Sequence, residues 1–363
     1  MRMHGRALWQ PFRIGGLLVM SILTLALLLT AACGDRGSAK NEKVGTQPAG
    51  RVTKTLRQIP LSLAEAYPDL LPQMAIGAGS LWLANSGDGT ITRVDLAEGK
   101  VVAEVTVSEN FRWEPNTSTP RSVAASGERV WFPDRTGRAV SRIDPNTNRV
   151  VERIPVPVDT FVFAIAIDGD DLWLTSPGDG LVLRVDAKNK RVVSTIDDLF
   201  VPTAIALGAG SVWVVDHEAD KVARIDPQTN KVVEQIPIGY TPATIAYGEG
   251  AIWTADLGSQ AVSRVDPETN KEVARIDTAM QTFGVAVGGG SVWATGWSVA
   301  GCESDKGGAL VRIDPETNKV AGRTRVDCAL SVAATDDAVW VQGEFREEGK
   351  PEGTLVRVEP TAR

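Results

Sequence analysis

The chain has 363 residues, of which 43% are hydrophobic and 23% are charged, so its composition is that of a packed globular protein and not of a disordered one. Its formal net charge is −7, and no basic stretch interleaved with aromatic residues occurs, so we expect no nucleic acid among its partners. Glycine is frequent, with 35 residues, and tryptophan outnumbers tyrosine by 10 to 3. Many short strands joined by tight turns would have this profile.

Residues 1–33 have the features of an export signal. Residues 1–13 carry three arginines and no acidic residue, and residues 14–32 are almost continuously apolar and end in two alanines before Cys33. This ending resembles a bacterial lipobox, which implies that Cys33 becomes a lipidated N-terminus, although Thr30 stands where the motif prefers an aliphatic residue. The alternative is an uncleaved membrane anchor, because about 19 apolar residues nearly span a bilayer. Either anchor places the protein on the outer side of a bacterial cytoplasmic membrane or in the periplasm or cell-wall space.

Residues 34–50 are polar and lack apolar periodicity, so they are predicted to form a flexible linker. We expect residues 51–363 to form the folded domain, as a monomer.

A tryptophan repeat dominates this domain and decides its predicted fold. Seven tryptophans recur at spacings of 49, 42, 40, 40, 40 and 47 residues: Trp82, Trp131, Trp173, Trp213, Trp253, Trp293 and Trp340. Each is followed by an Arg-Val/Ile-Asp/Glu triplet that begins at Arg93, Arg142, Arg184, Arg224, Arg264, Arg312 or Arg357. In the repeat at residues 241–278, apolar segments at 243–247, 251–255, 261–266 and 271–276 are separated by turn-forming residues. Four-stranded units of about 40 residues are typical of β-propeller blades, so the chain is predicted to be an all-β, seven-bladed propeller.

Four repeats continue from the triplet into an Asp-Pro-x-Thr-Asn turn, which starts at Asp144, Asp226, Asp266 or Asp314. Proline presets φ for a type I turn, aspartate caps it, and asparagine tolerates the left-handed conformation that rejoins the strand. The tryptophans are then expected to wedge between blades, each contributing at most about 4–6 kcal/mol through its buried area.

The two ends of the repeat array complement each other. The last repeat stops after a third strand at 353–358, and residues 57–61 parallel the fourth strand of another repeat at 234–238. We therefore expect the N-terminal strand to complete the seventh blade and to close the ring, which pairs an otherwise exposed edge.

The segment at 225–239, which reads IDPQTNKVVEQIPIG, resembles the YVTN-type bacterial β-propellers, and the Gly-x-x-Trp and Arg-Ile-Asp-Pro pieces are similar to virginiamycin B lyase propellers. The first resemblance implies an exported or surface protein. The second implies a lyase site of several histidines, a glutamate and a magnesium ion, but His217 is the only histidine after the export signal.

Candidate binding residues lie where the second strand of each repeat ends, three residues beyond its tryptophan. Polar side chains at these positions are expected to rim the central channel, as a binding site for a cation, a sugar or a metal, or only as loop caps and water ligands. The predicted binding face comprises Asn85, Asp134, Arg135, Ser176, Asp216, His217 and Asp256. We expect no cofactor and no dedicated metal site. The alternative is a divalent cation in the channel, bound by oxygen atoms from several blades.

Two longer loops interrupt the repeat on the same predicted face. Residues 110–119 carry Phe111 and Trp113, and residues 296–308 carry Trp297 and Cys302. Such loops can bind a glycan, a small molecule or an envelope protein, or can fold over the channel and pack their own aromatic rings. Cys302 and Cys328 are expected to form a disulfide outside the cytoplasm.

We therefore expect a non-catalytic ligand- or protein-binding lipoprotein of the cell envelope. A streptogramin B lyase-like enzyme with a divergent site is the alternative, with His217 and a neighbouring carboxylate as an acid–base pair.

Overall fold

The computed structural model describes residues 48–59, 73–85, 89–107, 120–134, 138–299, 301, 307–347 and 350–361. The chain divides into two compact units, Met1–Lys43 and Val44–Arg363. The predicted signal, Cys33, Arg135, Phe111, Trp113 and Cys302 lie outside the described residues. No helix among the described residues is long and apolar enough to cross a membrane.

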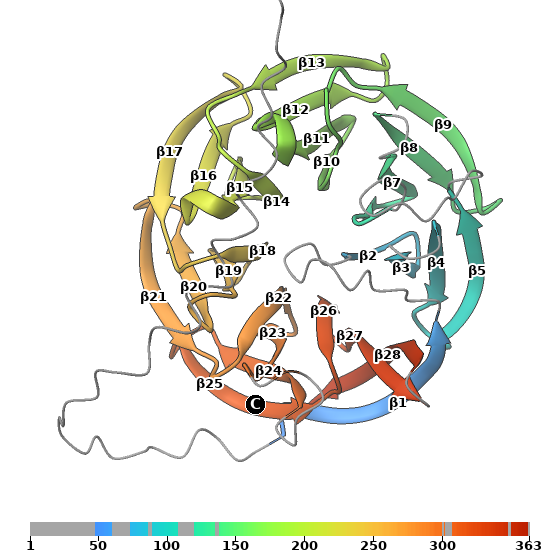
Figure 1. Ribbon diagram of the computed structural model, residues 1–363, viewed down its shortest axis with the longest axis vertical. Coiled ribbons are helices and arrows are strands. Elements are labelled where there is room, and N and C mark those ends of the chain that lie inside the picture. The colour runs from blue at the N-terminus through green and yellow to red at the C-terminus, as the bar shows by residue number, and fades with distance from the viewer. Residues whose placement is uncertain are drawn as a thin grey trace, which may run out of the picture. The chain divides into compact units, whose positions relative to one another are not determined.

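The strands form seven antiparallel sheets of four, arranged in a ring (Figure 1), so the predicted seven-bladed propeller is confirmed. Blade 1 comprises β2 (Met74–Gly77), β3 (Ser80–Asn85), β4 (Thr90–Asp95) and β5 (Lys100–Thr106). Blade 2 comprises β6 (Ala124–Ser126), β7 (Arg129–Asp134), β8 (Ala139–Asp144) and β9 (Arg149–Pro155). Blade 3 comprises β10 (Ile165–Asp168), β11 (Asp171–Ser176), β12 (Leu181–Asp186) and β13 (Arg191–Ile196).

The remaining blades continue in the same order. Blade 4 comprises β14 (Pro202–Gly208), β15 (Ser211–Asp216), β16 (Lys221–Asp226) and β17 (Lys231–Pro237). Blade 5 comprises β18 (Pro242–Gly248), β19 (Ala251–Asp256), β20 (Ala261–Asp266) and β21 (Lys271–Asp277). Blade 6 comprises β22 (Gln281–Gly288), β23 (Ser291–Trp297), β24 (Gly308–Asp314) and β25 (Lys319–Arg325). Two short 3-10 helices follow β11 and β15, at Pro177–Asp179 and His217–Ala219.

Blade 7 joins the two ends of the propeller. It comprises β26 (Ala329–Ala334), β27 (Val339–Glu347), β28 (Lys350–Pro360) and the N-terminal β1 (Gly50–Ile59). β1 pairs antiparallel with β28, with Thr55 opposite Val356 and Arg57 opposite Thr354. This confirms the predicted closure, with a longer strand than expected. Ala49 is 1% exposed, so the end of the segment expected to be a linker packs into the propeller.

Each repeat tryptophan packs onto the next blade. Trp253 of blade 5 lies in one apolar cluster with Val292 and Val311 of blade 6, and Trp340 of blade 7 lies in another with Leu81 and Leu83 of blade 1. Trp82, Trp131, Trp173, Trp213 and Trp293 lie in the corresponding clusters at the other boundaries. All seven are at most 2% exposed, so the rings fill the spaces between blades as predicted.

An arginine accompanies most of these rings and links two blades. The guanidinium of Arg264 lies 5.1 Å from the centre of the Trp253 ring in its own blade. Its Nη1 donates hydrogen bonds to Pro315 O at 2.7 Å and to Asn318 Oδ1 at 2.9 Å in blade 6. Asn318 is the last residue of the Asp-Pro-x-Thr-Asn turn, with φ of 55° as predicted. The turn therefore serves as the acceptor for the arginine of the preceding blade as well as closing its own hairpin.

Outer strands carry a bulge at one repeated position. In blade 4, Arg224 pairs with Glu234 and Ile225 pairs with Val232, so Val233 has no opposite residue, and it is 52% exposed. Val102, Val151, Val193 and Val273 occupy the same position in blades 1, 2, 3 and 5. A bulge twists an edge strand and interrupts its pairing groups, which protects the rim of the ring from joining another sheet.

Candidate functional site

A cavity of about 260 Å³ lies on the axis of the ring, and the innermost strand of every blade contributes to it. Most of the side chains that line it are apolar, including Met74, Ile205, Ile245, Val285 and Val332, but polar atoms contribute slightly more of the lining surface than apolar atoms do. The polar lining side chains are Gln73, Thr244 and Ser331. Thr244 Oγ1 also joins two blades, because it accepts a hydrogen bond from Val285 N at 3.1 Å and donates one to Phe283 O at 2.9 Å.

The predicted polar rim residues that the structure describes are not among the residues that line this cavity. Asn85 is fully buried and donates through Nδ2 to Thr90 and Thr92, at 2.8 Å each. Asp134 forms an ion pair of 2.9 Å with Arg153. Ser176 Oγ lies 2.6 Å from Asp179 Oδ2 and 2.8 Å from Phe161 O. These three side chains therefore hold strand ends and loops in their own blades.

Asp216 ends β15 and His217 follows it, and each contacts a connection between blades. The Asp216 carboxylate accepts hydrogen bonds from Phe200 N at 2.9 Å and Val201 N at 2.7 Å. His217 Nδ1 lies 2.7 Å from Pro242 O, which can only accept, so Nδ1 carries the proton in this contact. Because Pro242 begins β18, His217 links the loops of blades 4 and 5.

Some aromatic side chains on the predicted binding face are exposed, and one packs against a buried ring. Phe200 and Tyr240 precede the innermost strands of blades 4 and 5 and are 64% and 65% exposed. Trp297 ends β23 and packs against the buried Phe283, with 4.1 Å between ring centres. Cys328 is buried, and its expected disulfide with Cys302 stays a prediction.

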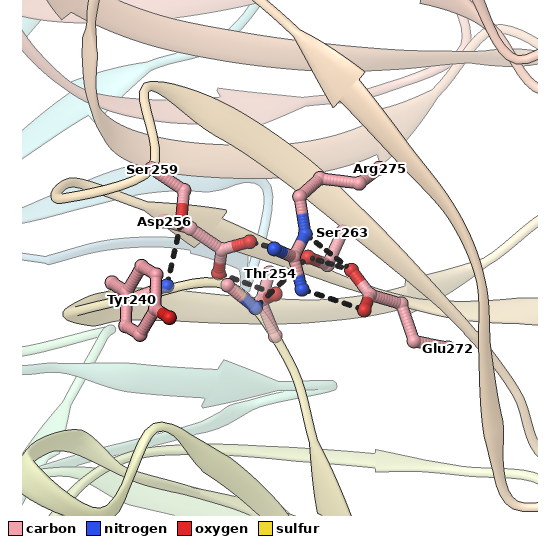
Figure 2. Close-up of polar contacts among 8 residues, drawn as sticks. Tyr240, Thr254, Asp256, Ser259, Ser263, Glu272 and Arg275 are labelled. Carbon is pink, nitrogen blue, oxygen red and sulfur yellow. Dashed lines mark hydrogen bonds and ion pairs between the residues drawn. The ribbon is translucent and has the colours of Figure 1, made fainter.

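Asp256 is the exception among the strand-end residues, and Figure 2 shows the polar cluster around it. Its carboxyl group is fully buried and contacts two hydroxyl groups, Thr254 Oγ1 at 2.8 Å and Ser263 Oγ at a short distance. Ser263 Oγ also lies 2.7 Å from Glu272 Oε1. Burial raises the pKa of Asp256 to about 7, and the negative charge of Glu272 acts in the same direction.

The cluster continues outward from Asp256 to the surface. Arg275 donates from Nε and Nη2 to the two carboxylate oxygens of Glu272, at 2.7 Å each. The hydrogen bonds and charge of Glu272 raise the pKa of Arg275. A buried carboxyl group is thus joined through one hydroxyl group to an ion pair that is partly exposed.

The repeat itself contains a signal for this cluster that sequence analysis missed. At the position of Glu272, blades 1, 2, 3, 4 and 6 have valine: Val101, Val150, Val192, Val232 and Val320. At the position of Thr254, the other six blades have apolar residues: Leu83, Phe132, Leu174, Val214, Ala294 and Val341. A comparison of blades would have shown that blade 5 replaces two apolar positions with polar ones.

Within the described parts of the chain, no group of three or more His, Cys, Asp or Glu side chains could hold a metal ion. The divalent-cation alternative therefore has no support from the described carboxylates.

Comparisons with known proteins agree with the fold. Residues 155–326 match the repeat of unknown function DUF6923. No protein with a curated description matches the chain by sequence. The structure is similar to virginiamycin B lyase from Staphylococcus aureus, with 14% identity and a TM-score of 0.64, covering 84% of this chain and 98% of the lyase.

Two further solved structures have the same arrangement. A chain of the mitotic checkpoint complex has 10% identity and a TM-score of 0.68, covering 93% of this chain and 98% of its own. Hydrazine synthase from Kuenenia stuttgartiensis has 14% identity and a TM-score of 0.61, covering 83% of this chain and 97% of its own. Identities this low show the fold alone. The chain is a seven-bladed β-propeller repeat protein.

Proposed function

We propose that this propeller is a non-catalytic binding protein, exported and anchored to the outer side of a bacterial membrane through a lipid on Cys33. Its ligand is a small molecule or a side chain of an envelope protein that has both apolar and polar groups, bound at the axis of the ring. The observation that carries this proposal is the axial cavity, which is lined mainly by apolar side chains from the innermost strands. Concave apolar sites with a few polar groups are typical of ligand binding.

The loop face adds support for recognition at one end of the axis. Phe200 and Tyr240 are exposed on neighbouring blades, and exposed aromatic side chains on a rigid scaffold supply contact area at low entropic cost. The acidic net charge of −7 fits a protein that does not bind nucleic acid.

The fluorescence of Nile red, a neutral apolar probe, tests the axial site directly. We expect the full chain to enhance the fluorescence, and Ala124→Phe, which places a large ring in the cavity lining, to weaken binding by about tenfold. Val332→Phe fills the same cavity from blade 7 and provides a second variant if the first does not fold. Val233→Thr on the exposed rim is the matched control and should bind as the parent does. Equal binding by all four proteins would exclude the cavity as the site.

Anchoring is tested separately by labelling cells with a radioactive fatty acid. The full chain should incorporate the label, and Cys33→Ala should not. A labelled Cys33→Ala variant would refute lipidation at this residue.

A streptogramin B lyase-like activity is the second candidate, and the similarity of the fold to virginiamycin B lyase favours testing it. His217, the only histidine beyond residue 4, has Nδ1 engaged with Pro242 O, which leaves Nε2 as its only nitrogen for acid–base chemistry. We expect no ring opening of streptogramin B by the purified protein. Turnover that His217→Ala abolishes would replace the binding proposal with the enzymatic one.

A further inference from the structure

Asp256 is held by groups unlike those around its counterpart in the preceding blade. Asp216, at the equivalent strand end, accepts hydrogen bonds from two backbone N–H groups, which stabilise a negative carboxylate. Asp256 has two hydroxyl partners within the described residues, from Thr254 and Ser263. A fully buried carboxylate with such partners is costly to ionise.

The hydroxyl group of Ser263 indicates which of its two carboxyl neighbours carries a proton. Its Oγ lies within hydrogen-bond distance of two carboxyl groups, Asp256 and Glu272, yet a hydroxyl group has a single proton to donate. Both contacts are hydrogen bonds only if one carboxyl group is protonated and donates to Ser263 Oγ. Glu272 is paired with Arg275 and stays ionised, so the proton belongs to Asp256. Ser263 then donates to Glu272 and accepts from Asp256 and, at 3.3 Å, from Gly239 N.

We propose that Asp256, Ser263 and Glu272 form a pH-sensitive switch in blade 5. While Asp256 carries a proton, the switch holds residues 238–241, the connection before β18, in place. When Asp256 loses this proton to solvent, the connection is released. Loss of the proton leaves two carboxylates competing for the single hydrogen of Ser263. One short contact then becomes a repulsion between oxygen atoms in a buried site.

The connection that responds to the charge of Asp256, residues 238–241, carries the exposed Tyr240. Gly239 packs directly on the Asp256 carboxyl group, so closely that a Cβ at Gly239 would overlap Asp256 Oδ2. Movement of the carboxylate is therefore transmitted to the neighbouring backbone. Tyr240 N donates to Ser259 Oγ at 2.7 Å, and Thr241 N donates to Asp220 Oδ1 at 2.8 Å, so these two amides report on the connection.

Among the described residues, the charged or titratable groups next to Asp256 and its connection come from three segments. Glu272 and Arg275 lie on β21, Tyr240 belongs to the connection itself, and Asp220 and His217 contact Thr241 and Pro242 from blade 4. Of these groups, Glu272 acts on Asp256 as a like charge and Arg275 as an opposite charge. Removing the Glu272 charge should therefore ease ionisation of Asp256.

Hydrogen exchange of the Tyr240 and Thr241 amides in the full chain, corrected for the intrinsic rate at each pH, tests the switch. Between pH 6 and pH 8 we expect protection to fall by about tenfold in the parent and to stay constant in Asp256→Asn. Asp216→Asn in blade 4 is the matched control and should keep the parental pH dependence.

Glu272→Gln provides a second measurement if Asp256→Asn does not fold. Its transition should move to lower pH by about one unit, because a neutral amide replaces the like charge. Equal pH dependence in the parent, Asp256→Asn and Glu272→Gln would overturn the proposal.

Discussion

Arg224 Nη1 donates a hydrogen bond to Asn270 Oδ1 at 2.9 Å, across the boundary between blades 4 and 5. The same nitrogen donates to Pro267 O at 3.0 Å, while the guanidinium lies 5.3 Å from the centre of the Trp213 ring. Three repeated motifs, the tryptophan, the arginine and the Asp-Pro-x-Thr-Asn turn, thus belong to one contact between blades. Arg93, Arg184 and Arg264 make the same contact at other boundaries.

Arg224→Ala should lower the free energy of unfolding by about 2 kcal/mol, because it removes three charge-assisted hydrogen bonds, including one from Nε to Ser211 Oγ at 2.9 Å, and a cation–π contact. Asn270→Ala should cost about 1 kcal/mol. Urea unfolding of the two single variants and the double variant measures the coupling between the side chains. Lys231→Ala, at an exposed position on β17, is the control. Additive losses would show that the two residues act independently.

At the boundary between blades 2 and 3, Lys190 replaces the turn asparagine, and Glu152 joins it to Arg142 with distances of 2.9 Å to each. Lys190 has φ of 55°, the same left-handed conformation as Asn230. We expect Glu152→Gln to cost about 1 kcal/mol at low salt and less at high salt, since this link is ionic and partly exposed. Asn270→Ala should show little salt dependence. The same salt response in both variants would contradict the distinction.

Trp253→Ala should cost about 3–5 kcal/mol, because it empties a fully buried space between blades 5 and 6. Trp297→Ala should cost less, since that ring is partly exposed and packs on one side against Phe283. Thermal unfolding of both variants provides the comparison. A larger loss at Trp297 would place the main aromatic contribution on the loop face and not between the blades.

The raised pKa of Asp256 predicts a global effect of pH. Because the folded-state pKa is about 7 and the ordinary value is 3.8, the native state retains a proton that the unfolded chain has released between these values. Stability therefore falls as pH rises from 4 to 7, by up to roughly 4 kcal/mol if nothing relaxes. Asp256→Asn should remove this component and be the more stable protein at pH 8. Urea unfolding across this pH range measures it, and parallel profiles for the two proteins would refute the assignment.

The features of the fold that recur in every repeat are predictable from the sequence. The number of blades, the strands of the unit at 241–278, the left-handed turn asparagines and the closing strand all follow from local patterns and their spacing. The contact between Arg224 and Asn270 is not predicted, because it joins residues 46 positions apart in two blades and the turn asparagine is already accounted for within its own hairpin.

The candidate site was predicted less well. Strand-end residues such as Asn85 and Ser176 are polar because they bind nearby loops and strands, so their polarity did not indicate a channel ligand. Asp256 and Asp216 occupy the same place in the repeat, three residues after a tryptophan, and the contacts among Asp256, Ser263 and Glu272 distinguish them in the structure. Burial of a carboxyl group depends on neighbours from several strands, which a single strand pattern does not report.

Hydrogen exchange of the β1 amides in the full chain tests the closed ring most directly. Because β1 pairs with β28 from Gly50 to Ile59, the amides bonded in this pairing should be protected to within about tenfold of those that bond β28 to β27. Exchange of β1 at the rate of an unstructured peptide while β28 stays protected would mean that the N-terminal strand does not close the seventh blade.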